Sequence, residues 1–418
     1  MLTLDGLGNN LQAMNPILPE EKARKACLSM MQAFEDTGYI DYDGERMVST
    51  ASLHEKGKGK VFGILITYEG TILKAFSGEL NGSYLIKPFV EPVIDPVAME
   101  KVTASFSKRM EAASKEEKTA LSQKCWKEMQ KLYRFHCHDG QLRALDEIAP
   151  SCPSGTGDCA GPRLLCAAYE RNQQPSSLAE FFYGDGSFES GTFLPPCDSR
   201  CKPILKHIIG LDIIFLDDEI IVVDKPEGLL SIPGKGPEKF DSVASRVRHH
   251  LRHVIAQPCV HRLDQATSGL LVLGLTDNAH DTLSMDFEKR NVGKEYEALV
   301  EGIITEDSGT IDLPMRLDTE HRPRQITDRK NGRQAITDWE KIRVERYEGR
   351  NVTRLKLMPR TGRTHQLRVH CSEGLGHPIV GDRLYGKADS RMMLCACYLE
   401  FTHPTAKKRM EFRIPCDF

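Results

Sequence analysis

The feature that most limits the fold is a series of short β-like runs in the second half of the chain. The runs are rich in aliphatic and β-branched residues, and turn or charged residues separate them. Few helical patterns lie among them, which favours an α+β fold with a mixed, mostly antiparallel sheet and a central cleft over a doubly wound parallel sheet. The runs are "DIIFLDDEIIVVDK", "LLVLGLT", "EYEALVEGII", "QAITDWEKIRVER" and "NVTRLKLMP".

The first half of the chain has a different texture, and we predict a domain boundary near residue 203. Residues 204–418 then form one domain, and residues 1–203 form an N-terminal accessory region of α/β type. Two β segments are expected in that region, at 61–68 and 71–76. A charged stretch without glycine follows at 95–135, and it predicts a long helix of up to about ten turns, or two helices in sequence.

Residues 150–203 form a module rich in Gly, Pro, Ser and Cys. Two pieces of it, 162–171 and 177–183, have helix-like patterns. The chain has 13 cysteines, an odd number, and several lie in apolar surroundings, which favours reduced thiols over a disulfide framework. The first residues lack the pattern of a signal peptide, and no apolar run is long enough to span a bilayer. We therefore expect a cytoplasmic protein with no membrane partner.

Net charge does not indicate a nucleic-acid partner, because the chain carries −3 overall. An RNA partner would have to bind a local basic surface instead. Two basic clusters exist, "RLDTEHRPRQITDRKNGRQ" and "PRTGRTHQLRVH". Taken alone, the first cluster is interpreted as a solvated loop.

One short stretch, "VHRLDQATSGLLVLGLT", sets a carboxylate at the start of a predicted core strand. Asp264 follows Arg262 by two residues and precedes the apolar run. A carboxylate that must stay ionised and fixed needs a nearby cation, and both Arg262 and Arg363 are candidates. Tyr296 offers an aromatic ring to a planar ligand. A structural ion pair remains the alternative for Asp264.

Five separated blocks change that balance, because together they resemble the RluA-type family of RNA pseudouridine synthases. They match in sequence, order and approximate spacing over about residues 210–418. Within the family, this half resembles the branch without an S4 domain, which includes the dual-specificity enzyme acting on a 23S rRNA loop and a tRNA anticodon stem–loop. The blocks are "DKPEGLLSIPG", "HRLDQATSGLLVLGLT", "KEYEALVEG", "RTGRTHQLRVHCSEGLGHPIVGDRLYG" and "LEFTHP".

The resemblance implies an isomerase that converts uridine to pseudouridine in RNA without a cofactor. It implies that Asp264 is the catalytic carboxylate and that Tyr296 packs against the flipped uracil. Arg363 is expected to pair with Asp264 and hold it ionised. Arg262 is expected to help extrude the target base, since the reacting atoms are otherwise hidden by stacking.

Further RNA contacts are expected from the two basic clusters of the same half. The histidines His261, His365 and His370 are interpreted as structural or phosphate contacts and not as acid–base catalysts. The partner is then an rRNA or tRNA stem–loop, and the protein is expected to be a monomer. The expected substrate-binding residues are Arg262, Arg322, Arg324, Gln325, His365 and Arg368.

The accessory region carries a weaker pattern. "GTGDCAGPRLLCAAYE" followed by "PPCDSRC" is similar to the zinc-site blocks of deaminase-like domains, with Cys159, Cys197 and Cys201 as candidate ligands of a structural zinc. However, Gly161 stands where a deaminase carries its proton-shuttling Glu, so deaminase activity is not expected. Buried thiols in a loop-rich module are the preferred interpretation, and a bound metal is the alternative.

A second function, from another class, is an RNA-binding or RNA-folding factor with little or no turnover. It would bind a stem–loop without isomerising it. The presence of Asp264, Tyr296 and Arg363 together in one chain speaks against it.

Overall fold

The computed structural model describes residues 17–40, 48–111, 113–251 and 253–418. The chain divides into two compact units, unit 1 before and unit 2 after the junction of Asp217 and Asp218. The boundary that we predict from composition, near residue 203, precedes this division by little more than one short helix and one strand. No helix among the described residues has the length and apolar character needed to cross a membrane.

Unit 1 is an α/β unit built around a small antiparallel sheet of order β2-β1-β5. Its elements are α1 (Glu21–Thr37), β1 (Lys60–Thr67), β2 (Ile72–Phe76), α2 (Pro96–Glu111), α3 (Lys115–Gln130), β3 (Arg134–His136), β4 (Leu142–Ala144), α4 (Leu145–Ile148), α5 (Ala160–Glu170), β5 (Pro175–Tyr183), α6 (Lys202–Ile209) and β6 (Asp212–Leu216).

Helices α1 and α5 cover the two faces of this sheet. Phe62 and Ile64 of β1 point toward α1, where they join a cluster of buried apolar side chains. Gly63, between them, faces α5 instead, and a Cβ atom placed there would lie 3.0 Å from Leu164 Cδ1. The absence of a side chain at Gly63 therefore lets the start of α5 pack closely on the sheet.

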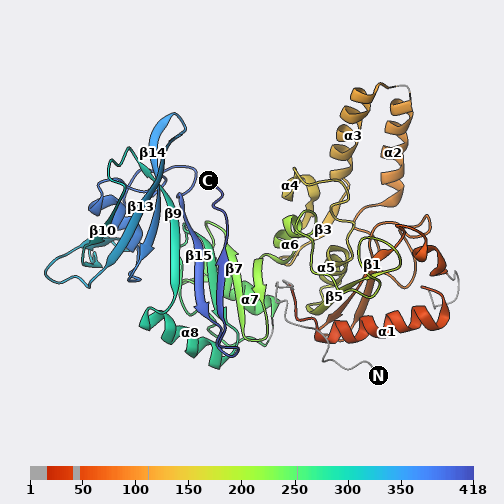
Figure 1. The fold of residues 1–418 in the computed structure, drawn as a ribbon, viewed down its shortest axis with the longest axis horizontal. Coiled ribbons are helices and arrows are strands. Elements are labelled where there is room, and N and C mark those ends of the chain that lie inside the picture. Colours follow the sequence, from red (N-terminus) through yellow and green to blue (C-terminus); the bar gives the residue numbers. More distant parts are fainter. Residues whose placement is uncertain (1–16, 41–47, 112, 252) are drawn as a thin grey trace. The chain divides into compact units, whose positions relative to one another are not determined.

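The charged stretch at 95–135 forms two helices, so the alternative of one long helix is wrong. Ser114 begins α3 with a capping box, in which its Oγ accepts from the Glu117 N–H and its own N–H donates to the Glu117 carboxylate. Asp95 caps α2, because its Oδ1 accepts from the Val97 N–H at 2.9 Å. The two helices run side by side and project from the rest of unit 1 (Figure 1).

Residues 177–183, which we interpret from sequence as a helix, belong to strand β5. This strand pairs with β1 and is buried along almost its whole length. An element buried on both faces has no polar stripe, so its apolar pattern does not separate strand from helix. The predicted helix at 162–171 corresponds to α5, and the predicted strands at 61–68 and 71–76 correspond to β1 and β2.

Unit 2 has the predicted mixed, mostly antiparallel sheet, in the order β10-β13-β14-β9-β15-β8-β7, with β16 paired to β15. Only the β15–β8 pair is parallel among the strand pairs described in unit 2. Its elements are β7 (Ile220–Lys225), α7 (Val243–His250), β8 (Ser268–Gly274), α8 (Asp277–Lys289), β9 (Gly293–Glu301), β10 (Ser308–Asp312), β11 (Met315–Leu317), β12 (Gln325–Thr327), β13 (Ile336–Tyr347), β14 (Arg350–Pro359), α9 (Gln366–Val369), β15 (Leu394–Thr402) and β16 (Arg409–Arg413).

The middle of this sheet is the support for the site. Tyr296 of β9 lies opposite Leu357 of β14 and Ala396 of β15, so its position is fixed from both sides. Figure 1 shows β9 and β15 in the centre of unit 2, with α8 at one end of them. The stretch "THQLRVHCSEG" contains α9, and a π-helical turn continues this helix to Gly374.

Candidate active site

A cleft of about 980 Å³ opens in unit 2. Most of its lining comes from four segments: the stretch 260–264 before β8, the end of α8 with the start of β9, the end of β14, and the stretch 360–368 that leads into α9. Asp264, Arg262, Tyr296, Arg363, His365 and Arg368 all border this cleft. The structure thus brings together six of the residues that we predict from sequence.

Asp264 lies on a turn that hydrogen bonds hold on both sides. Its carbonyl accepts from the Thr267 N–H at 3.0 Å, which closes the turn into β8. On the side before Asp264, Ser231 Oγ donates to the Leu263 carbonyl at 2.8 Å and accepts from the Leu263 N–H at 3.0 Å. These bonds hold the backbone of the turn, so the carboxylate has a rigid base.

Lys225 adds three hydrogen bonds to the backbone around this turn. Its fully buried Nζ donates to the carbonyls of Pro226, Leu229 and Gln265, at 2.9, 2.8 and 3.2 Å. Burial lowers the pKa of Lys225 to about 8, although the charges of Glu227 and Asp264 oppose that shift. Lys225 therefore ties the residue that follows Asp264 to the preceding loop and does not face the cleft.

Two side chains approach the carboxylate of Asp264. Arg368 Nη1 lies 3.5 Å from its Oδ2, and His365 Nε2 lies 3.9 Å from the same atom. Arg368 is itself held by a two-point ion pair with Asp382, at 2.8 and 2.6 Å. Asp382 is fully buried and also accepts from the backbone N–H groups of Leu384 and Tyr385. The guanidinium thus has a fixed orientation before any substrate arrives.

Our expectation that Arg363 pairs with Asp264 is wrong. Arg363 Nε donates to the Gln334 carbonyl at 3.1 Å, and its N–H donates to Gln366 Oε1 at 3.0 Å. Arg363 precedes α9 and stays exposed, whereas Arg368 lies within α9 and is 6% exposed. Arg368, which we expected to contact substrate, is therefore the cation at the carboxylate.

Tyr296 stands in the wall of the cleft on β9. Burial raises the pKa of its phenol, and the negative charge of Asp264 raises it further. The phenol therefore stays neutral at physiological pH. A neutral ring beside a carboxylate can pack against a planar base and donate one hydrogen bond.

His365 connects the carboxylate to a more distant hairpin. Its Nδ1 lies 2.8 Å from Tyr385 Oη, and that oxygen accepts from the Gln325 N–H at 2.7 Å. Burial lowers the pKa of His365, so the imidazole is neutral at physiological pH, although the Asp264 charge opposes the shift. The arrangement links Asp264, His365, Tyr385 and β12 in one chain of polar contacts.

The other two histidines have structural roles. His261 stacks on Phe287 at 4.3 Å and accepts from the Val272 N–H, and burial lowers its pKa to about 3. His370 is fully buried between Thr337 Oγ1 and the Leu313 carbonyl. His370 lies outside the cleft lining, and His261, which borders the cleft, uses its Nε2 to accept from the Val272 N–H.

The remaining predicted RNA contacts divide into two groups. Arg262 is exposed at the cleft, and its guanidinium has no hydrogen bond or ion pair with any described residue. Arg322, Arg324 and Gln325 lie outside the cleft lining, on the hairpin of β11 and β12. Arg324 lies over the ring of Tyr385, at 5.3 Å from the ring centre. Tyr385 and His365 therefore link the hairpin to the cleft.

Sequence reasoning assigned no role to Tyr385, Asp382, Lys225 or Ser231 at this turn. The first two stand in "VGDRLYG" and the others in "DKPEGLLS", inside blocks that carried the family resemblance. The blocks were a usable signal. What they could not give is which of their polar residues face the cleft and which hold the turn.

We expect Tyr385→Phe to loosen the hairpin and not the cleft floor. The ring would stay between Arg324 and Arg368, but the Gln325 N–H and His365 Nδ1 would lose their partner. The expected loss in the free energy of unfolding is about 1–3 kcal/mol. Hydrogen exchange at the Gln325 amide should become faster, and Tyr347→Phe, on the distant end of β13, serves as the control. Unchanged exchange at Gln325 would remove Tyr385 as the link.

Comparison with known proteins matches unit 2. A family model described as RNA pseudouridylate synthase matches residues 219–373. The chain is 43% identical over 213 residues to the dual-specificity RNA pseudouridine synthase RluA of Haemophilus influenzae, a match that covers 50% of this chain and 94% of that protein. The protein of the same name from Escherichia coli K12 gives the same identity and coverage.

Among solved structures, human RNA pseudouridylate synthase domain containing 1 is 33% identical and has a TM-score of 0.42. The match covers 49% of this chain and 83% of the human one. The sequence identity to relatives matched over nearly their whole length is the decisive finding. Because of it, the chain belongs to the RluA-type family of RNA pseudouridine synthases, isomerases that convert uridine to pseudouridine in RNA.

Proposed function

We propose that unit 2 isomerises specific uridines in a structured RNA, with Asp264 as the catalytic carboxylate. The observation that carries this proposal is the array of Asp264, Arg368 and Asp382 at the floor of the cleft. It supplies an oriented carboxylate in a space large enough for an extruded nucleotide. The substrate is a 23S rRNA loop, a tRNA anticodon stem–loop, or both, and the dual-specificity name of the relatives supports action on more than one RNA site.

The reaction explains why a carboxylate is needed. When the bond between N1 and C1′ breaks, positive charge develops at C1′, and Asp264 stabilises or captures that carbon. The uracil then turns, C5 bonds to C1′, the proton on C5 leaves and N1 gains a proton. All atoms stay within one nucleotide apart from the exchanged protons, so the step needs no cofactor.

The other cleft residues have roles that follow from their contacts. Arg368 fixes the orientation of the Asp264 carboxylate, and Tyr296 contacts the uracil as a neutral ring. Arg363, exposed at the rim, and Arg262 meet the RNA. His365 positions the rim, while Arg322, Arg324 and Gln325 place the hairpin against the stem. The protein acts as a monomer, and the free cysteines suit a reducing compartment such as the cytoplasm.

The direct test is release of tritium from RNA labelled at C5 of uridine, followed by mapping of the product. The full chain should release tritium from an rRNA loop or a tRNA anticodon stem–loop, at one position in each RNA that it accepts. Binding of these RNAs without any release would instead identify an RNA-binding or RNA-folding factor.

We expect Arg262→Ala to lower kcat/KM by about 10–100-fold without changing the fold. Arg262 has no described partner to lose, so its loss should affect only base extrusion and the RNA contact. A substrate with the target uridine already unpaired has a lower extrusion cost, so the defect should shrink there. An equal defect on paired and unpaired targets would show that Arg262 does not act in extrusion.

A further inference from the structure

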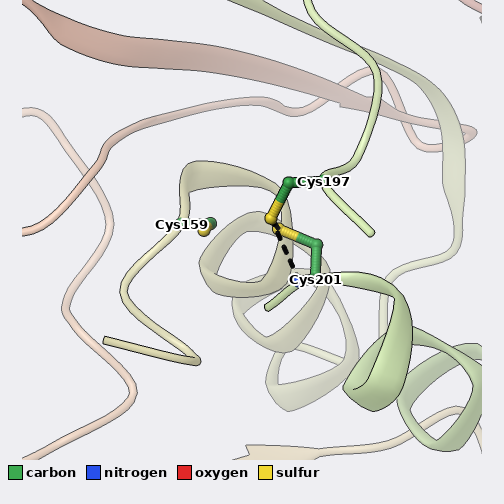
Figure 2. Close-up of side chains that lie close together, drawn as sticks. All are labelled: Cys159, Cys197 and Cys201. Carbon is green, nitrogen blue, oxygen red and sulfur yellow. Dashed lines mark hydrogen bonds between the residues drawn. The ribbon is translucent and has the colours of Figure 1, made fainter. Parts of the chain in front are cut away.

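Three thiols of unit 1 lie close enough to bind one metal ion. The sulfur atoms of Cys159, Cys197 and Cys201 all lie within 4.8 Å of one another. Figure 2 shows them together, Cys159 at the start of α5, Cys201 at the start of α6, and Cys197 on the segment before α6. Cys197 Sγ and Cys201 Sγ are 3.5 Å apart. That is too far for a disulfide and near the roughly 3.8 Å between two thiolates on one tetrahedral zinc.

The backbone around the three thiols presents two helix N-termini and one N–H group to them. Cys159 is the N-cap of α5 and Cys201 is the N-cap of α6, so two helix N-termini meet at the cluster. The positive ends of helices stabilise a nearby thiolate. The Cys201 N–H also donates to Cys197 Sγ at 3.4 Å. These features hold the three thiols in place before a metal arrives.

A buried carboxylate lies next to the same cluster. Glu180, on β5, faces α5, is 7% exposed, and its Oε1 accepts from the Gly161 N–H at 2.8 Å. Its Oε2 has no hydrogen-bond partner among the described residues and lies 2.9 Å from where a Cβ of Gly161 would be. Glu180, on strand β5, therefore fills the space that a side chain at position 161 of α5 would occupy.

Gly161 and Gly63 make this placement feasible. A Cβ at Gly63 would lie 3.2 Å from Glu180 Cγ and 3.2 Å from the Ala160 Cβ. Both glycines leave room for the Glu180 side chain between β1 and α5. From sequence, the lack of a glutamate at position 161 argued against zinc-assisted water chemistry. In the structure, Glu180 takes the place of that missing glutamate.

We propose that Cys159, Cys197 and Cys201 bind one Zn²⁺ and that Glu180 accepts a hydrogen bond from the water in its fourth position. No fourth His, Cys, Asp or Glu atom of the described residues joins the cluster within 4.8 Å. Three protein ligands with an open position are typical of catalytic zinc, whereas structural zinc usually has four. A carboxylate beside the metal-bound water can take its proton, which leaves hydroxide on the metal.

A second group of potential ligands in unit 2 lacks these properties. It consists of Glu297, Cys397 and Cys416. Glu297 there already pairs with Arg354 at 3.2 Å, so its charge is used. The proposal is therefore restricted to unit 1 and is independent of the isomerase reaction.

The metal is tested on the full chain by elemental analysis and by replacement with Co²⁺. We expect about one zinc per chain and, with Co²⁺, a thiolate-to-metal charge-transfer band with tetrahedral visible absorption. Cys197→Ser should lose most of both signals, while Cys125→Ser, on α3 and outside the cluster, should keep them. No metal in the wild-type chain after reconstitution, or a disulfide between Cys197 and Cys201, would overturn the proposal.

Glu180→Gln separates a water-holding carboxylate from a structural one. The variant should keep the metal and the charge-transfer band, but the midpoint of the pH-dependent change in the Co²⁺ visible spectrum should move. A Cys125→Ser midpoint equal to that of the wild type serves as the reference. Loss of the metal in Glu180→Gln, or an unmoved midpoint, would contradict the role assigned to Glu180.

Discussion

Asp264→Asn should abolish turnover while leaving RNA binding close to that of the wild type. The amide keeps the size of the carboxylate but has no charge to stabilise or capture C1′. We expect tritium release to fall by at least about 10³-fold. The turn itself should persist, because the hydrogen bonds that hold it come from Ser231, Lys225 and the Thr267 N–H. None of these bonds involves the Asp264 carboxylate.

The control for this variant is Asp277→Asn, an exposed carboxylate in the first turn of α8. It should keep full tritium release and full affinity. Binding of the stem–loop should be measured for both variants at one salt concentration, since phosphate contacts depend on it. Retained turnover in Asp264→Asn would remove Asp264 from the reaction, and a large loss of affinity would point to an RNA contact instead.

Asp382→Asn should be strongly destabilising and should also reduce turnover. It leaves the nearly buried charge of Arg368 without its two-point partner, and breaking such a pair from one side costs about 3–5 kcal/mol. The freed guanidinium would also no longer be aimed at Asp264. The free energy of unfolding from denaturant titration measures the first effect, and kcat at a temperature where the variant is folded measures the second.

The chain provides a matched control for this prediction. Arg246 and Asp241 form a two-point pair of similar geometry, at 2.8 and 2.7 Å, but this pair is exposed. Asp241→Asn should therefore cost less than about 1 kcal/mol. Equal costs for the two variants would mean that burial adds nothing to the Arg368–Asp382 pair.

The fold of unit 2 could be predicted from sequence because each strand carries its own local signal. Alternation and flanking turn residues identified β13 and β14 without any tertiary information. Strand β5 lacked such a signal, since it is buried on both faces and its identity is decided by pairing with β1. The break between α2 and α3 depended on one capping box within a continuous helical pattern.

The sequence predicted which residues border the cleft, but not which of them pair with each other. Asp264, Tyr296 and Arg368 all stand in recognisable blocks, and the structure places them in one cleft. Which arginine meets the carboxylate depends on where α9 begins and which of its faces turns inward. That is set by Asp382, a residue fourteen positions after Arg368. Local sequence carries no record of such a choice.

The contacts that hold and orient Asp264 also determine at which stage of synthesis the site is assembled. Arg368 and Asp264 are separated by 104 positions in sequence, and Lys225 and Gln265 by 40 positions. Arg368 in turn is oriented by Asp382, which follows it in the chain. Loops of that span close slowly compared with local structure. A chain emerging from the ribosome therefore contains Asp264 long before it contains Arg368 and Asp382, which orient the carboxylate. No nascent or truncated form ending before Asp382 holds the assembled site, so RNA modification has to wait until synthesis has passed Asp382.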